Sequence, residues 1–314
     1  MGTFLEELQN TLKAINPDSA TFTINHVTKP NNVEKTAICI RQADSNIGCN
    51  YYLEELQRRY NAGQSIEEIA ADIMNHCMTD STLRNGSILT SLLTNLTSYE
   101  KVKEQISIRL LNLRKNNEYL ADKVYFPFIK GDDSYELAIC LYIRVPVGND
   151  TLGSITVTKQ LRSQWKISDD ELLQNAMDST MRNHGCKLKN IFEVISQLME
   201  TKDSFSDFMN PPEPSMYVLT NDEGFNGAAT LVYPEKLREI ADQLNSDLFI
   251  IPSSIHELIL IPDDGTIQPD SILEMIIQVN STEVAPSEVL SNKLFYFSRT
   301  NNLVTIVKSS TQED

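Results

Sequence analysis

The sequence contains one segment that cannot lie inside a helix or a sheet. Residues 203–215 read DSFSDFMNPPEPS and hold three of the chain's 12 prolines, with Pro211 and Pro212 adjacent. Proline has no backbone N–H, and its ring clashes with the preceding turn of a helix, so this pair breaks both kinds of regular structure. We therefore predict a Pro-rich linker at 206–215 that divides the chain.

The linker separates regions that we expect to fold separately. An N-terminal α+β domain is predicted over residues 1–122, and a central strand-helix unit over residues 123–205. A C-terminal α+β domain follows at 216–308, and the polar residues 309–314 are expected to form a solvated tail. The pattern is compatible with residues 1–205 forming either one domain or two.

Apolar runs and helical spacing predict the elements before the linker. The predicted strands are 20–28, 34–41, 106–113, 124–129, 137–145 and 154–158. The predicted helices are 1–16, 51–60, 99–105, 159–165 and 169–182, with one more beginning at Ser65. Ser65 has Glu68 three residues later, which is the spacing of a capping box, and Ser168 is expected to cap the helix at 169–182.

Strands and helices alternate differently beyond the linker. The predicted strands are 216–220, 227–231, 248–251, 257–261, 294–298 and 304–307, and the predicted helices are 234–244 and 270–279. This order indicates an α+β fold of antiparallel sheets with helices packed on one face. The two helix pairs that begin near residues 51 and 159 also suggest repeated strand-strand-helix-helix units.

Charge and composition narrow the classes of partner. The 314 residues carry a net charge of −16, and the 27 Lys and Arg residues form no dense stripe, which disfavours nucleic acid and anionic membranes. No run of 18 apolar residues is present, so we expect no membrane span. Five cysteines without a C-x-x-C pair are typical of reduced thiols, which predicts a cytoplasmic protein.

The sequence lacks the common catalytic and cofactor motifs. It contains no G-x-G-x-x-G or G-x-x-x-x-G-K phosphate loop, no G-x-S-x-G elbow and no D-x-D-x-D-G calcium loop. His26, His76 and His184 are single and have no second ligand pair at a metal-binding spacing. We therefore expect no cofactor, no metal and no catalytic residue; the sequence favours a protein that is not an enzyme, without deciding the question.

Six side chains are the candidates for a binding site: Asn221, Asp222, Ser253, Ser254, His256 and Glu257. Ser, His and a carboxylate are the components of nucleophilic catalysis. Asp263, however, lies about 20 Å from His256 along an intervening strand, so Asp222 or Glu223 would have to supply the carboxylate. The alternative is structural, because Ser hydroxyls and an imidazole also satisfy backbone groups in a hairpin turn.

A resemblance to a known family rests on four stretches: SITVT at 154–158 with Trp165, YVLTN at 217–221, GAA at 227–229 with Tyr233, and IIPSSIHE at 250–257. These stretches resemble an uncharacterised family of bacterial proteins, a domain of unknown function found in Gram-positive anaerobes. The chain is more distantly similar to YtpQ-like proteins. The resemblance is most specific over residues 125–265. It implies a bacterial cytosolic protein with a shared architecture, and it carries over no catalytic residues.

Three hypotheses for function follow. The first is a non-catalytic protein-binding or regulatory module, whose acidic surface suits a basic protein partner. The second is a small-molecule-binding protein or hydrolase-like enzyme with a site around Asn221, Asp222, Ser254 and His256. The third is an acidic mimic of nucleic-acid charge, which requires carboxylates gathered on one face. The sequence leaves the oligomeric state open.

Overall fold

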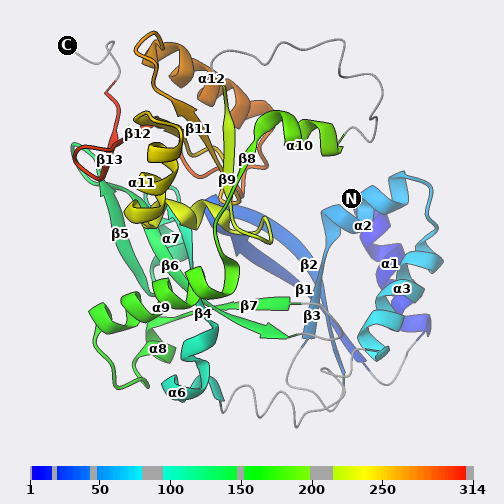
Figure 1. Ribbon diagram of the computed structural model, residues 1–314. Coiled ribbons are helices and arrows are strands. Elements are labelled where there is room, and N and C mark those ends of the chain that lie inside the picture. The colour runs from blue at the N-terminus through cyan, green and yellow to red at the C-terminus, as the bar shows by residue number, and fades with distance from the viewer. Residues whose placement is uncertain are drawn as a thin grey trace.

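The protein consists of three antiparallel sheets with helices packed against them. The computed structural model describes residues 2–15, 20–42, 48–79, 95–146, 152–198 and 215–308. Within these residues the three sheets have three, four and six strands (Figure 1). The predicted α+β class is therefore confirmed.

The first sheet has three helices on one face. Its strands pair in the order β1-β2-β3, which are Ala20–Lys29, Val33–Gln42 and Gly48–Tyr52, with the turn η1 (Pro30–Asn32) between the first two. The helices α1 (Gly2–Ile15), α2 (Leu53–Asn61) and α3 (Ile66–Thr79) gather beside this sheet (Figure 1). Leu8 and Leu12 of α1 are four residues apart, so they share one helix face. They pack with Ile38 and Ile40 of β2 in a buried core.

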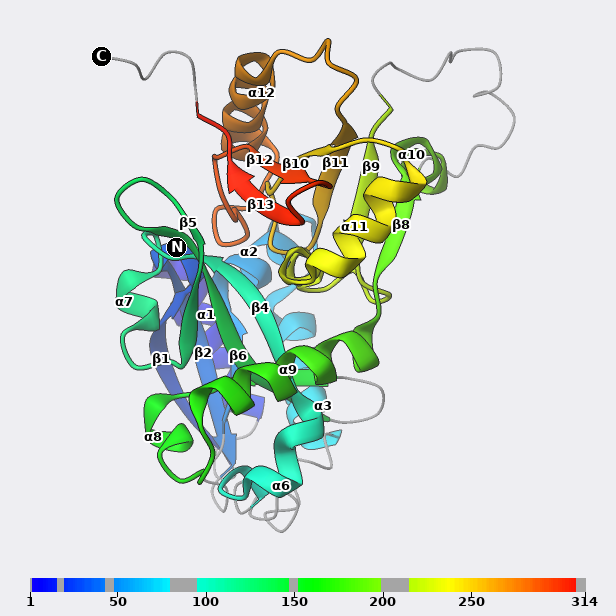
Figure 2. The same ribbon diagram turned by 60° about the vertical axis from the view of Figure 1, so that its left-hand side comes forward.

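The second sheet carries the long helix α9 (Asp169–His184) on one face. Its strands pair in the order β4-β6-β5, with β7 also paired to β6; they are Ile106–Asn112, Tyr135–Pro146, Tyr125–Lys130 and Leu152–Thr156. The hydroxyl of Thr180 in α9 accepts a hydrogen bond from Ile108 N of β4 at 2.9 Å. Figure 2 shows α9 running across the sheet. The short helices of this part are α6 (Tyr99–Val102), η2 (Lys103–Gln105), α7 (Asn117–Leu120) and α8 (Lys159–Arg162).

Both predicted helix caps are confirmed. The Ser65 hydroxyl accepts a hydrogen bond from Glu68 N at 3.1 Å, and Ser65 N donates to the Glu68 carboxylate at 3.1 Å. The Ser168 hydroxyl accepts from Glu171 N at 3.2 Å at the start of α9. Each cap satisfies backbone N–H groups that have no partner inside the helix. The order strand, strand, helix, capped helix thus occurs as β2-β3-α2-α3 and again as β6-β7-α8-α9.

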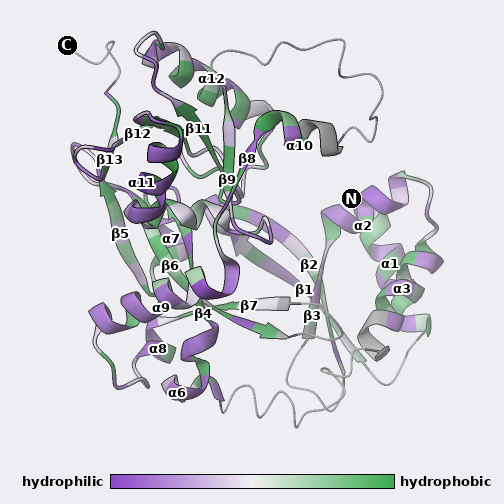
Figure 3. Ribbon diagram, viewed as in Figure 1, coloured by the Kyte–Doolittle hydropathy of each residue, from purple (hydrophilic) through white to green (hydrophobic). Residues whose placement is uncertain are grey.

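The third sheet pairs in the order β13-β12-β10-β11-β9-β8. In this order the strands are Leu303–Ile306, Phe295–Ser298, Leu248–Ile251, Leu258–Pro262, Tyr217–Thr220 and Lys187–Asn190. Its helices are α10 (Ile191–Leu198), η3 (Gly227–Val232), α11 (Pro234–Gln243) and α12 (Pro269–Thr282). In Figure 3, β11 is largely hydrophobic and α11 largely hydrophilic, as expected for a buried strand and a surface helix.

Neighbouring residues of β10 enter two different cores. Leu248 and Ile250 join the main core, which also contains Leu237 of α11. Phe249 and Ile251 face the other way and pack with α12. Because side chains alternate along a strand, this six-stranded sheet has a helix on each face.

The predicted strand at 227–231 is wrong. These residues form η3, a 3-10 helix in which every side chain is buried. Asn226 has φ of 55°, which turns the chain before η3, and the Thr230 hydroxyl donates to Gly227 O at 2.8 Å. A segment buried on all sides shows no polar-apolar period, so the run of apolar residues did not distinguish a strand from a helix.

The predicted linker lies outside the described residues except for Ser215. The strands on its two sides pair with each other, because Lys187 of β8 is opposite Thr220 of β9. The third sheet therefore includes a strand from each side of the predicted division. The predicted tail at 309–314 also lies outside the described residues.

Candidate functional site

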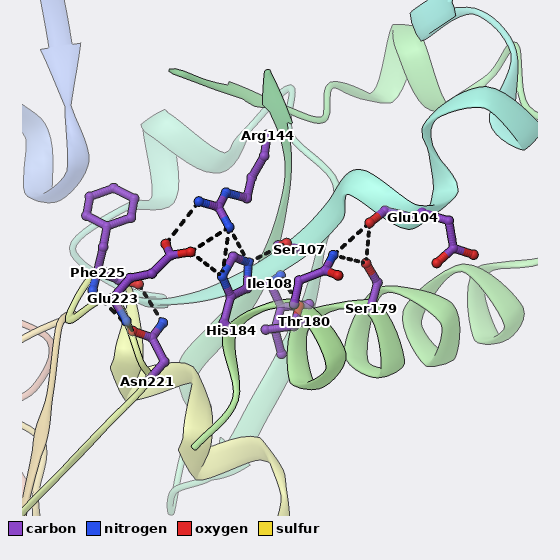
Figure 4. Close-up of polar contacts among 11 residues, drawn as sticks. Glu104, Ser107, Ile108, Arg144, Ser179, Thr180, His184, Asn221, Glu223 and Phe225 are labelled. Atoms are coloured by element: carbon purple, nitrogen blue, oxygen red, sulfur yellow. Dashed lines mark hydrogen bonds and ion pairs between the residues drawn. The ribbon is translucent and has the colours of Figure 1, made fainter. Parts of the chain in front are cut away.

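His184 is the buried centre of a polar network between the second and third sheets (Figure 4). It is the last residue of α9, where the chain leaves the second sheet for β8. Arg144 of β6 donates to the His184 ring from Nη1, at 2.9 Å from Nδ1 and 3.3 Å from Nε2. Glu223, in the loop after β9, forms a bidentate ion pair with Arg144 at 2.9 and 3.0 Å. The Glu223 Oε1 also lies 3.3 Å from His184 Nδ1.

Ser107 of β4 completes the network on the other side of the ring. Its hydroxyl lies 3.0 Å from His184 Nε2. Two groups of opposite hydrogen-bonding type face Nδ1: the Arg144 guanidinium, which can only donate, at 2.9 Å, and the Glu223 carboxylate, which can only accept, at 3.3 Å. The shorter contact favours the neutral tautomer in which Nδ1 accepts from Arg144 and Nε2–H donates to Ser107.

The environment of His184 favours its neutral form. Its side chain is 2% exposed, whereas those of Arg144 and Glu223 are 19% and 39% exposed and cover it from solvent. Burial lowers the pKa of His184, and the Arg144 guanidinium lowers it further, while Glu223 acts in the opposite direction. A proton added to Nδ1 would end its hydrogen bond from Arg144 and leave Glu223 as its acceptor.

Ser107, His184 and Glu223 have the order of groups found in nucleophilic hydrolases, but not the access. The Ser107 side chain is fully buried, so a substrate cannot reach its oxygen in this conformation. Arg144 also holds the nitrogen that an orienting carboxylate would use. The geometry therefore supports a polar network that joins the second and third sheets, and it does not present an accessible nucleophile.

The loop between β9 and η3 is held by Asn221. Its side-chain oxygen accepts from Glu223 N at 3.2 Å and Phe225 N at 3.3 Å, and its amide nitrogen donates to Phe225 O at 2.8 Å. Asp222 N donates to His184 O at 2.9 Å, which satisfies a carbonyl at the end of α9. The loop is therefore fixed to the same helix that carries His184.

His256 lies on the other side of this loop. Its Nδ1 accepts a hydrogen bond from Asn226 N at 3.2 Å, so this nitrogen carries no proton. Its Nε2 lies 3.7 Å from the Glu288 carboxylate. The ring also packs against the Phe225 ring, with 5.4 Å between the centroids and a tilt of 37°. Phe225 itself is 49% exposed and lies at the left of the network, beside Glu223, in Figure 4.

The six candidate residues have different roles in the structure. Asn221 is buried and shapes the loop, while Asp222 is exposed on it. The Ser254 hydroxyl accepts from His256 N at 3.0 Å, so it serves the turn. Ser253 is buried and its carbonyl accepts from Leu290 N at 3.0 Å; Glu257 is exposed beside His256.

Sequence reasoning missed Arg144, His184 and Glu223 as one cluster. A signal was present, because Arg144 interrupts the apolar run LAICLYIRVPV and so requires a partner where the strand is buried. No local spacing points to His184, which lies 40 residues from Arg144 and 39 from Glu223.

The described residues contain neither a metal-binding cluster nor a membrane-spanning helix. No group of three or more His, Cys, Asp or Glu side chains lies close enough there to hold a metal ion. Among the same residues, every helix is too short or too polar to cross a membrane.

One known family matches nearly the entire chain. The model of a family of unknown function, DUF5688, matches residues 1–299. The chain belongs to DUF5688. This membership agrees with the resemblance to an uncharacterised domain of unknown function. No curated protein and no solved structure matches the chain.

The DUF5688 match includes both the His184 network and the loop between β9 and η3. It runs from α1 to the end of β12, and so contains Ser107, Arg144, His184, Glu223 and Phe225. All three sheets contribute to the matched region. The first sheet and its helices are therefore part of the DUF5688 chain and not a separate addition.

Proposed function

We propose that the protein is a non-catalytic binding module that holds a basic segment of a partner protein against Phe225. The observation that carries this proposal is an exposed aromatic ring on a fixed loop that also carries two carboxylates, Asp222 and Glu223. Asp222 and Glu223 precede Phe225 in the loop, the Glu288 carboxylate lies 3.7 Å from Nε2 of the His256 ring on which Phe225 packs, and the exposed Glu257 follows His256 in the chain.

The chemistry of this surface suits a Lys or Arg side chain. A cation over an aromatic face is attracted by the ring quadrupole, and nearby carboxylates add to that attraction. Glu223 is already paired with Arg144, so Asp222, Glu257 and Glu288 are the carboxylates that would meet the incoming charge. The net charge of −16 would also steer a basic partner towards the protein.

The loop is already ordered before a partner arrives. The Asn221 side chain makes three hydrogen bonds to the loop backbone, and His256 receives a fourth from Asn226 N. A preorganised loop loses little conformational entropy when it binds, which favours affinity. These hydrogen bonds commit the Asn221 side chain to the loop backbone, which supports a binding surface over a catalytic role for Asn221.

The test uses peptides of defined charge. A fluorescein-labelled octapeptide of alternating Arg and Gly is titrated with the protein at physiological salt, and its anisotropy is compared with that of a Gln-Gly octapeptide. We expect only the Arg peptide to bind. An exposed cation–π contact contributes about 0.5–1 kcal/mol, so Phe225→Ala should weaken binding about two- to fivefold, and Phe225→Trp should preserve or strengthen it.

The matched control separates the ring from the net charge. Ile277→Ala removes a side chain of similar exposure (55%) on α12 and changes no charge, so it should bind as the wild type does. Equal affinities of the wild type and Phe225→Ala would mean that the peptide responds only to total charge, and the proposal would be abandoned.

We also infer that the protein is a bacterial cytoplasmic protein. The resemblance to domains of Gram-positive anaerobes and, more distantly, to YtpQ-like proteins supports a bacterial source. Cys39, Cys140 and Cys186 are free thiols, which is the state that a reducing compartment favours. Isolation of the protein from its native host, with fractionation of cytoplasm from envelope, tests this inference.

A further inference from the structure

Two cavities adjoin where β13 approaches β5, in a part of the molecule that the Phe225 loop does not reach. The first has a volume of about 430 Å³ and lies against the turn between β5 and β6. The second has a volume of about 360 Å³ and lies between β5, β13 and the start of α11. Lys130 and Thr305 line both cavities. Figure 2 shows β13 beside the turn that follows β5.

The first cavity concentrates positive charge in a strongly acidic protein. Its walls include Arg114, Lys130, Lys293 and Lys308. Among the described residues, only Lys308 of these four has a carboxylate at ion-pair distance, namely Asp132 at 3.0 Å. Three cationic side chains thus border one cavity with no negative partner in the described part of the chain.

Two of the three carboxylates in the wall are already engaged. Asp132 pairs with Lys308. Glu136 Oε1 accepts from Asn112 Nδ2 at 3.0 Å and from the Ser291 hydroxyl at 2.6 Å, so it is directed into the protein. Only Asp133 has no such engagement among the described residues. The cavity therefore has an excess of positive charge that an anion would neutralise.

The second cavity is apolar and rests on an unusual backbone. Its walls are formed mainly by Phe128, Ile129, Leu231, Val232, Leu303 and Val304. Ile129 has φ of 53°, in the left-handed region that β-branched residues rarely occupy. The pairing of β5 with β6 omits this residue, passing from Phe128 to Lys130. Such strain persists where the surrounding structure enforces it, and it is common at ligand sites.

We propose that the two cavities together bind a small amphipathic anion. Its phosphate or carboxylate group would lie with Lys130 and Lys293 in the first cavity, and its short apolar group would lie in the second. Lys130 borders both cavities, so one molecule can use the charge and the apolar wall together. Cavities of this size and mixture of walls are typical of small-molecule sites.

The experiment separates the two halves of the ligand. Binding of butyl, hexyl and octyl phosphate is measured by isothermal titration calorimetry, beside inorganic phosphate, hexanoate and hexanol. We expect saturable binding of the alkyl phosphates, with affinity rising about fourfold for each added methylene group that is buried. Comparison of hexanoate with hexyl phosphate shows which anionic group the site prefers.

Three variants assign the binding to these residues. Lys130→Gln combined with Lys293→Gln should weaken hexyl phosphate at least tenfold, and both side chains are exposed, so the fold should persist. Leu303→Ser, at the exposed rim, should reduce the gain per methylene group. Lys166→Gln combined with Lys187→Gln removes the same charge elsewhere and should leave binding unchanged.

The outcomes that overturn the proposal are equally specific. Absence of saturable binding at millimolar alkyl phosphate would refute the site. Equal loss of affinity in the two double-lysine variants would show that only the net charge acts. Inorganic phosphate binding as tightly as octyl phosphate would refute the role of the apolar cavity.

Discussion

Asn31 and Asn116 exchange two hydrogen bonds between the first and second sheets. Asn31 N donates to Asn116 Oδ1 at 2.6 Å, and Asn116 Nδ2 donates back to Asn31 Oδ1 at 2.8 Å. The side-chain nitrogen Nδ2 of Asn31 also donates to Pro286 O and Val289 O, at 2.8 and 2.7 Å. One asparagine pair thus connects the turn between β1 and β2 to the segment after β4 and to the segment after α12.

Replacing Asn116 should therefore weaken the contact between the first and second sheets and lower the stability of the protein. Asn116 is fully buried, and Asn116→Ala would leave Asn31 N and the Asn31 side-chain oxygen without these partners. A buried polar group left unpaired costs about 1–3 kcal/mol, so we expect the free energy of unfolding to fall by that amount. Urea unfolding followed by circular dichroism measures it. Asn301→Ala, at an exposed position, is the control and should change the unfolding free energy by less than about 0.5 kcal/mol.

The stability of the protein should depend on pH through His184. The unfolded residue takes up a proton near its ordinary pKa of 6.5, whereas burial makes the folded residue protonate only at lower pH. Below pH 6.5 the unfolded chain thus binds more protons, so the free energy of unfolding falls as pH decreases and is level above that value. One proton limits this slope to about 1.4 kcal/mol per pH unit.

Urea midpoints measured from pH 8 to pH 5 test this dependence, since carboxylates titrate mainly below that range. The His184→Gln variant should be less stable throughout but should show a flatter profile than the wild type. Parallel profiles for the two proteins would assign the pH dependence to other groups.

The two neighbours of His184 should shift its pKa in opposite directions. Arg144→Gln removes a cation that lowers the pKa, so the pKa of His184 should rise. Glu223→Gln removes the anion that raises it, so the pKa should fall. The imidazole proton resonances in NMR spectra report both values, and the signal missing from His184→Gln identifies the residue. Shifts in the same direction in both variants would contradict the arrangement of charges described for this network.

Local signals in the sequence predicted local structure well. The capping serines were identifiable because a cap depends only on residues within one helical turn, as with Ser65 and Glu68. The strands at 294–298 and 304–307 were likewise predicted from local apolar runs, and they pair as β12 and β13. The His184 network was not predicted, because Ser107 and His184 are 77 residues apart in the sequence and only the packing of the folded chain brings them into contact.

The loop between β9 and η3 was predicted only in part. Asn221 and His256 were identified from residue type and from their position at strand ends, and the structure places them on either side of one loop. Phe225 was overlooked as a binding residue because an isolated phenylalanine in a sequence predicts burial. The ring is 49% exposed and immediately precedes the left-handed residue Asn226, and no pattern of apolar residues indicates this arrangement.

Gly227 should be the least replaceable residue of this loop. A Cβ at this position would clash with the Thr220 hydroxyl and the His256 carbonyl, and would lie 2.8 Å from Asn221 N. These atoms are backbone or are fixed, because the Thr220 hydroxyl donates to His256 O at 2.8 Å. Gly227→Ala should therefore lower the free energy of unfolding by about 3 kcal/mol, as for an overpacked core.

Gly224→Ala is the matched control in the same loop. Gly224 has φ of 66°, and nothing lies within 4 Å of an added Cβ, so only the backbone conformation is penalised. That cost is about 1 kcal/mol. Urea unfolding should thus give Gly227→Ala a clearly lower free energy of unfolding than Gly224→Ala. Equal stabilities would mean that Thr220 and His256 can move apart, and the loop would then not be the fixed support that the Phe225 surface requires.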